Sequence, residues 1–196
     1  ALEYANADFY RYYLSSKLNT DISDINFSVD DFVQKINSDL IGKYINIASR
    51  TQNFLTKHNN SEVKQNCQNE TNKYKDLYAE IVSQTNDREY SKALKNIMSI
   101  ADEANAYISS AEPWSKAKEG QIDACIEICS ESLNLFKDLT ILLNPFIPNI
   151  TESLFEMLNL KQTDYDQISK DSLKEVRPFK TIITRLEKSE FEGILN

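Results

Sequence analysis

Residues 31–57 read DFVQKINSDLIGKYINIASRTQNFLTK, and this stretch decides the fold because apolar residues recur along it mostly at spacings of three and four. On a helix such residues share one face, which needs a core to pack against. That apolar face consists of Phe32, Val33, Ile36, Leu40, Tyr44, Ile47 and Phe54. The polar stripe on the other side consists of Asp39, Lys43, Asn46, Arg50, Asn53 and Lys57. Amide, guanidinium and amine groups suit nucleobase edges and phosphates, so the stripe is a candidate binding surface; a solvated helix face is the alternative.

Most of the remaining chain is also predicted to be helical. Only three glycines and four prolines occur in 196 residues, and few breakers favour long helices. Ser28, three residues before Asp31, predicts an N-terminal cap for the long helix. Apolar spacing predicts further helices at about 5–18, 61–84, from about 87 to Pro113, 120–143, one ending near 160 and a short one from about 189. No segment alternates like a strand, so the predicted fold class is an all-α helical bundle.

The length predicts one domain. A chain of 196 residues buries roughly 70% of its unfolded surface, which is enough for a single core. We therefore expect residues 1–196 to form one domain, with the bundle core at 28–160 and closing helices at 161–196. A start at Ala1, already close to a helical pattern, indicates a piece of a longer protein.

Composition limits the class of partner. A net charge of −8 and a pI near 4.8 argue against a broad nucleic-acid surface, which is usually basic. The positive groups are segregated, however, so a local patch could still bind RNA. They are Lys35, Lys43, Arg50 and Lys57 on the long helix, and Lys116 and Lys118 further on. No run of about 18 apolar residues and no secretory signal occurs, which predicts a cytoplasmic protein without a membrane partner.

The sequence lacks the parts of a catalytic or metal site. His58 is the only histidine, which excludes a histidine pair or a metal triad. The three scattered glycines cannot form a phosphate-binding loop. Cys67, Cys125 and Cys129 are an odd number without zinc-ligand spacing, so we expect reduced, structural thiols. No catalytic residue, metal ligand or cofactor is predicted in this chain.

A second candidate site lies at Pro113 and Trp114. Proline disfavours helical angles at Glu112 and ends the preceding helix, so Trp114 is expected at a helix break. A lone tryptophan usually packs in a core. The neighbouring Lys116 and Lys118 favour a surface corner instead, where an indole ring can stack on an unpaired base.

These segments carry a resemblance to a known family. NSDLIGKYINIASR at 37–50 and EPWSKAK at 112–118 resemble the anticodon-binding domain of methionyl-tRNA synthetases. The similarity continues in DFYRYYLSSKL at 8–18 and, more loosely, in ILLNPFIPNITESLFEMLNL at 141–160 and RPFKTIITRLEKSEFEGIL at 177–195. The resemblance implies a bundle of the class I aminoacyl-tRNA synthetase anticodon-binding type, with 1–20 as the junction helix from an absent catalytic domain. Phe9-Tyr10 and Glu112 depart from the family's usual residues.

The resemblance also implies a function. The parent enzyme would be a ligase that attaches methionine to its tRNA using ATP. This chain has neither the HIGH-type motif nor the Lys-Met-Ser-Lys-Ser loop, so it is expected to be non-catalytic. Any ATP or zinc would be held by the absent catalytic part. The implied partners are initiator and elongator methionine tRNA and the parent's own catalytic domain, with no DNA.

The resemblance also implies roles for particular residues. Asn46 and Arg50 match the family's N-x-A-S-R pattern, which faces the CAU anticodon. Pro113 and Trp114 match the platform on which the first, unstacked anticodon base lies. Further RNA contacts are expected from Lys43, Asn53, Lys57, Lys116 and Lys118.

Two alternatives remain open. The anticodon domain of a valine, isoleucine, leucine or cysteine synthetase would share the architecture, although the pattern of Asn46, Arg50 and Trp114 argues against it. A helical interaction module with no RNA role predicts that Trp114 is buried and that Asn46 and Arg50 are held in intramolecular contacts.

Overall fold

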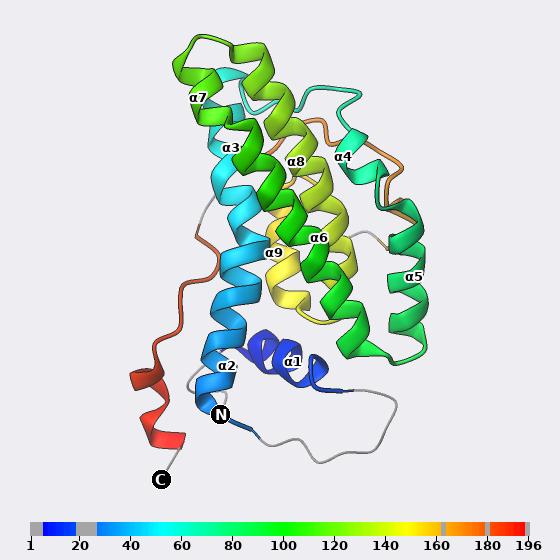
Figure 1. The fold of residues 1–196 in the computed structure, drawn as a ribbon, viewed down its shortest axis with the longest axis vertical. Coiled ribbons are helices and arrows are strands. Elements are labelled where there is room, and N and C mark those ends of the chain that lie inside the picture. The colour runs from blue at the N-terminus through cyan, green and yellow to red at the C-terminus, as the bar shows by residue number, and fades with distance from the viewer. Residues whose placement is uncertain (1–5, 19–26, 162–163, 179–180, 195–196) are drawn as a thin grey trace.

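The computed structural model describes residues 6–18, 27–161, 164–178 and 181–194. They form a bundle of helices, in which α1 lies at one end and α7 at the other (Figure 1). The α-helices are α1 (Ala7–Ser15), α2 (Val29–Lys35), α3 (Asn46–His58), α4 (Asn69–Asn72), α5 (Lys75–Asn86), α6 (Tyr90–Ala111), α7 (Pro113–Lys118), α8 (Ile122–Leu143) and α9 (Pro148–Met157). A π-helix η1 (Ile36–Ile45) and two 3-10 helices, η2 (Tyr165–Gln167) and η3 (Lys188–Ile194), complete the set. The predicted all-α class is confirmed.

The predicted long helix is present and runs without a break from Val29 to His58 through α2, η1 and α3. The Ser28 side chain caps it by accepting a hydrogen bond from the Asp31 backbone at 3.4 Å. The π-helical middle was not predicted. A π-helix bonds residue i to i+5 and so has more residues per turn than an α-helix. An apolar spacing of four, as in Ile36 and Leu40, fits either kind of helix.

The core is built around α8, which packs against both α3 and α6. Every residue of α8 from position 128 to 143 is buried, as expected of a helix covered on all sides. The long helix packs on it through Tyr44, whose ring stacks on Phe136 with centroids 4.8 Å apart. The Tyr44 hydroxyl donates to Thr140 Oγ1 at 2.7 Å, which satisfies a fully buried polar group.

The predicted helix at 61–84 is wrong in its first part. Residues 61–68 form an irregular loop, and helix begins only at Asn69. The loop pairs instead with the closing segment: Val63 N donates to Lys174 O at 2.8 Å, and Val176 N donates to Ser61 O at 2.9 Å. Val63 is buried although it lies outside any helix, so its apolar character indicated burial without indicating helix.

The ends of the chain differ from expectation in detail. Leu14 is 40% exposed although it is apolar, because Tyr12 and Tyr13 take the core-facing side of the short helix α1. In the closing segment, the described residues form the 3-10 helices η2 and η3 joined by irregular backbone. This segment still packs on the bundle, since Phe191 lies edge-on to Phe32 with ring centroids 5.6 Å apart.

The three cysteines are buried, and no disulfide bond joins any two of them. None of the helices in the described ranges combines the length and apolarity that a bilayer crossing requires.

Candidate nucleic-acid interface

The predicted residues Asn46 and Arg50 lie on α3 one helical turn apart, and both contact α6. Asn46 Nδ2 donates to Asn105 Oδ1 at 2.9 Å. Arg50 Nη1 donates to the Asn105 backbone oxygen at 3.3 Å, and Nη2 donates to Ser109 Oγ at 3.0 Å. The two side chains are therefore held in place by α6 before any ligand binds.

Trp114 completes this arrangement. The Arg50 guanidinium lies over its indole ring, 5.0 Å from the ring centroid, which is cation–π geometry. The ring is 38% exposed, so the predicted surface corner is correct. We call the surface formed by Asn46, Arg50, Asn105 and Trp114 the Trp114 face.

The backbone around Trp114 explains why the ring stays outside the core. Glu112 ends α6 with φ 49° and ψ 61°, a left-handed conformation that stops the helix before the proline. Pro113 then starts α7 and is buried, which anchors the corner. The expectation that proline would force Glu112 away from helical angles is confirmed.

Arg50 carries its charge in a partly desolvated position. Partial burial lowers the pKa of the Arg50 guanidinium from its usual value. Arginine nevertheless stays protonated at physiological pH, because its ordinary pKa is so high. A cation held against an aromatic ring next to a side-chain amide can contact a phosphate, a base edge and a base plane together.

The lysines predicted to contact RNA differ in their surroundings. Lys43 forms a salt bridge with Asp102 at 2.7 Å, so it is partly neutralised. Asn53, Lys57 and Lys118 are exposed, and Lys116 is half-buried. Within the described ranges, no side-chain hydrogen bond or ion pair involves these last four residues. Their charges and their amide remain available to a ligand.

Asp39 was placed on the polar stripe, and this is wrong. It is 5% exposed, accepts a hydrogen bond from the Tyr12 hydroxyl at 2.8 Å and pairs with Lys35 at 2.9 Å. Asp39 lies in the π-helix, where more residues fill each turn than the 3.6-residue spacing assumes. Asp39 therefore does not belong to the stripe, whereas Lys43, also on η1, contacts Asp102 on α6, the helix that Arg50 contacts.

The alternative of a helical interaction module with no RNA role made two predictions, and the structure agrees with only one of them. Asn46 and Arg50 do make intramolecular contacts, as that alternative expects, but Trp114 is not buried. An exposed ring beside a positioned amide and guanidinium is instead typical of a surface prepared for a planar ligand.

Asn105 and Ser109 were not singled out from the sequence. Both lie 55 or more residues from Arg50 along the chain, so only the tertiary structure brings them to it. A signal did exist for Asn105, because asparagine is a poor helix former and this one stands in the middle of a 22-residue helix.

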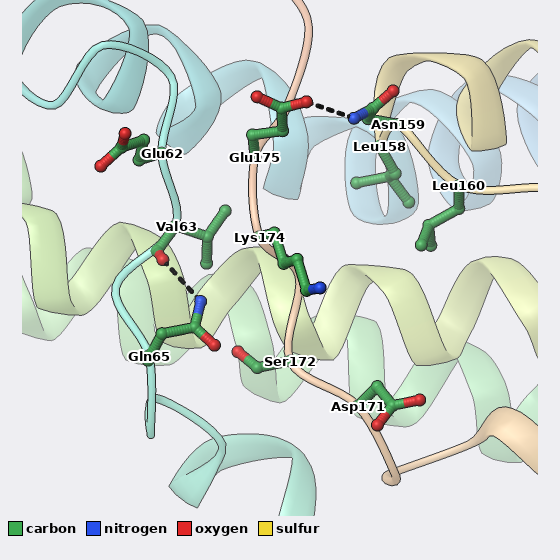
Figure 2. A pocket seen from close by; sticks show the side chains of 10 residues that line it. All are labelled: Glu62, Val63, Gln65, Leu158, Asn159, Leu160, Asp171, Ser172, Lys174 and Glu175. Atoms are coloured by element: carbon green, nitrogen blue, oxygen red, sulfur yellow. Dashed lines mark hydrogen bonds between the residues drawn. The ribbon is translucent and has the colours of Figure 1, made fainter.

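A hollow of about 830 Å³ lies elsewhere, between residues 62–65, 158–160 and 171–175 (Figure 2). Its lining includes the carboxylates of Glu62, Asp171 and Glu175 against one lysine, which is unfavourable for phosphate. The Glu175 carboxylate also accepts a hydrogen bond from Asn159 Nδ2, and this contact joins the end of α9 to the closing segment. Among the described residues, no group of three or more histidine, cysteine or carboxylate side chains could hold a metal.

Comparison with known proteins gives a consistent result. The family model described as the anticodon binding domain of methionyl tRNA ligase matches residues 58–186, and the one described as tRNA synthetases class I (M) matches residues 1–52. The second match ends inside the long helix, at residue 52, and the first begins at the last residue of that helix, residue 58. The predicted division of the chain at 1–20, 28–160 and 161–196 stays a prediction.

Individual relatives are similar over nearly the whole chain. A methionine–tRNA ligase of Burkholderia ambifaria is 35% identical over 195 residues, covering 97% of this chain and 27% of the relative. One from Psychrobacter cryohalolentis is 34% identical over 198 residues, covering 98% of this chain and 28% of the relative. This chain thus spans little more than a quarter of the length of these relatives.

Solved structures agree on the fold. The apo form of Mycobacterium tuberculosis methionyl-tRNA synthetase superposes with a TM-score of 0.80 at 19% identity, over 95% of this chain and 40% of that chain. The same enzyme in complex with methionyl-adenylate also gives 0.80, at 20% identity and over 94% and 38% of the two chains.

Proposed function

The chain belongs to the methionyl-tRNA ligase family, and from this premise we propose that its Trp114 face binds the CAU anticodon of methionine tRNAs. The observation that supports the proposal is the meeting of Asn46, Arg50 and Trp114, which are separated in sequence by up to 68 residues, on one accessible surface. An amide, a guanidinium and an indole ring are the groups that recognise unstacked bases in single-stranded RNA loops.

Each group has a separate part in the proposed recognition. The indole ring of Trp114 stacks on the first anticodon base, an interaction of about 1–3 kcal/mol per base. Asn46 and Arg50 form hydrogen bonds with the edges of splayed bases. Lys43, Asn53, Lys57, Lys116 and Lys118 contact the backbone around the loop, and Pro113 keeps the ring in place.

The rest of the proposal concerns the parent protein. We infer that it attaches methionine to initiator and elongator methionine tRNAs using ATP, in a catalytic domain outside this chain, which also holds any zinc. On this view the 196-residue chain supports no methionine-dependent pyrophosphate exchange. Appreciable exchange by the purified chain would contradict that assignment.

A fluorescence titration tests the binding proposal. Trp114 is the only tryptophan, so its emission reports on the proposed site alone. At low salt, a CAU stem-loop is expected to quench the emission, and a loop with a changed anticodon is expected to do so only at much higher concentration.

Fluorescence anisotropy of a labelled stem-loop supplies the matched measurement on Trp114→Ala. We expect the variant to bind the CAU loop about 5- to 150-fold more weakly, corresponding to the loss of one base stack. Equal binding of both loops by the unsubstituted chain would overturn CAU recognition.

A further inference from the structure

Asn105 lies at the centre of the hydrogen bonds that hold the Trp114 face together. Its Nδ2 donates to two backbone oxygens, Lys43 O on η1 and Ala101 O on its own helix, each at 2.8 Å. A carbonyl oxygen can only accept, so the amide nitrogen of Asn105 must face these two groups. Its Oδ1 is thereby turned toward α3.

The orientation of the Asn105 side chain in turn fixes the orientation of the Asn46 side chain. The Asn105 Oδ1 atom can only accept, and the atom it meets at 2.9 Å is Asn46 Nδ2. The side-chain amide of Asn46 therefore directs its nitrogen toward α6 and its Oδ1 away from α6. Among the described residues no donor is bonded to Asn46 Oδ1, and the residue is only half-buried.

Arg50 depends far less on the Asn105 side chain. Its contact with Asn105 Oδ1 is long, at 3.4 Å. It also contacts the Asn105 backbone oxygen, Ser109 Oγ and the Trp114 ring, and none of these contacts needs the Asn105 amide. Truncation of Asn105 should therefore release Asn46 and leave Arg50 in place.

From this we propose, resting on the proposed function, that Asn105 is a positioning residue that makes Asn46 an obligatory acceptor and so selects cytosine over uracil at the first anticodon base. Cytosine presents an exocyclic N4 amino group, a donor that Asn46 Oδ1 can accept. Uracil presents an oxygen at the same place, which would face another oxygen. An amide that was free to turn over would bind either base.

Stem-loops with CAU and UAU anticodons measure the selection. The unsubstituted chain should prefer CAU, and in Asn105→Ala the ratio of the two dissociation constants should fall by about tenfold, mainly through weaker CAU binding. Asn96→Ala is the matched control, because Asn96 lies on the same helix and bonds Gln84 on α5, away from this surface. Thermal melting of both variants establishes that they are folded.

A double variant shows whether Asn105 acts through Asn46. If it does, Asn46→Ala alone abolishes the discrimination and the double variant Asn46→Ala, Asn105→Ala loses no more. An unchanged CAU/UAU ratio in a folded Asn105→Ala variant would overturn the inference and leave the proposed function standing. Failure of the unsubstituted chain to distinguish the loops would overturn the proposed function and the selective role together.

The hydrogen bond between Asn105 and Asn46 can also be tested in the absence of RNA. In the free chain, the Asn46 side-chain amide protons should move in a ¹⁵N-resolved NMR spectrum toward the shifts of a solvated amide when Asn105 becomes alanine. No movement of these two resonances would show that Asn105 does not orient Asn46, whatever the binding data give.

Discussion

Single residues on α8 tie the closing segment to the core. Lys137 and Asp138 form a buried pair at 3.2 Å, with side chains 4% and 0% exposed. Asp138 also accepts from Thr71 Oγ1 at 2.5 Å and from Ser169 N at 3.1 Å, while Lys137 donates to Asp171 O at 2.5 Å. Charges buried in this way are tolerated because each has several partners.

Removal of one member of that pair should be costly. We expect Asp138→Ala to lower the free energy of unfolding by about 3–5 kcal/mol, because Lys137 would keep a buried charge without its carboxylate. Urea denaturation measures the difference.

The control is Glu127→Ala, which breaks a solvent-exposed pair with Lys64 and should leave stability almost unchanged. Similar losses in the two variants would contradict the importance of burial.

Among the elements, η1 connects several parts of the bundle. Its ten residues include Asp39, which bonds Tyr12 on α1, and Tyr44, which bonds Thr140 on α8. Asn37 joins the closing segment: Nδ2 donates to Leu186 O and Oδ1 accepts from Leu186 N, each at 2.9 Å. The wider turns of a π-helix direct these side chains at three different neighbours.

The Asn37 contact gives a prediction about this element. Asn37→Ala should speed hydrogen exchange of the Leu186 amide and lower stability by about 1–3 kcal/mol, because two buried or half-buried backbone groups lose their partner. NMR hydrogen exchange measures the first effect.

Ser38→Ala, at an exposed neighbouring position, should leave Leu186 exchange unchanged. Equal exchange in both variants would mean that the closing segment does not depend on Asn37.

For the whole molecule, buried cysteine thiols and tyrosine hydroxyls should determine the highest pH at which the fold is stable. Burial raises the pKa of Cys67 from its usual 9.0 to about 11, and it also raises the pKa values of Cys129, Tyr12 and Tyr44. Because the folded state then keeps protons that the unfolded chain loses, this contribution is fully present below pH 9. It is lost as the pH rises through the folded-state pKa.

We therefore expect the melting temperature to fall between about pH 9 and pH 11, with each such group contributing about 1.4 kcal/mol per pH unit above its unfolded pKa. Thermal melts at several pH values measure the slope. Cys67→Ala should make it shallower by the equivalent of one proton, and an unchanged slope in that variant would argue against titration of Cys67.

RNA affinity on an acidic molecule should depend on few cations. The net charge is −8, so we expect about three phosphate contacts and a slope of log K against log salt of about −2. Lys118→Gln should reduce the magnitude of the slope by about 0.7, and do so for any loop sequence.

Lys75→Gln is the matched control, because Lys75 is an exposed lysine on α5, which lies on the other side of the bundle from α3 (Figure 1). An equal change in both variants would indicate a diffuse charge effect and no local contact at Lys118.

The sequence by itself determined the elements whose signals are local. The long helix, its cap at Ser28, the corner at Glu112 and Pro113 and the exposure of Trp114 all follow from backbone preferences or spacing within a few residues. The same local reasoning, with the resemblance, selected Asn46 and Arg50 as candidates, and their function stays a proposal.

Only the tertiary structure decided what depends on residues far apart in the chain. It showed the loop at 61–68, which pairs with the closing segment over more than a hundred positions, and the inward turn of Asp39 within η1. It also placed Asn105 behind Asn46. The physical reason is that hydrogen-bond partners supplied by another helix leave no periodic trace in the sequence, whereas burial of an apolar face does.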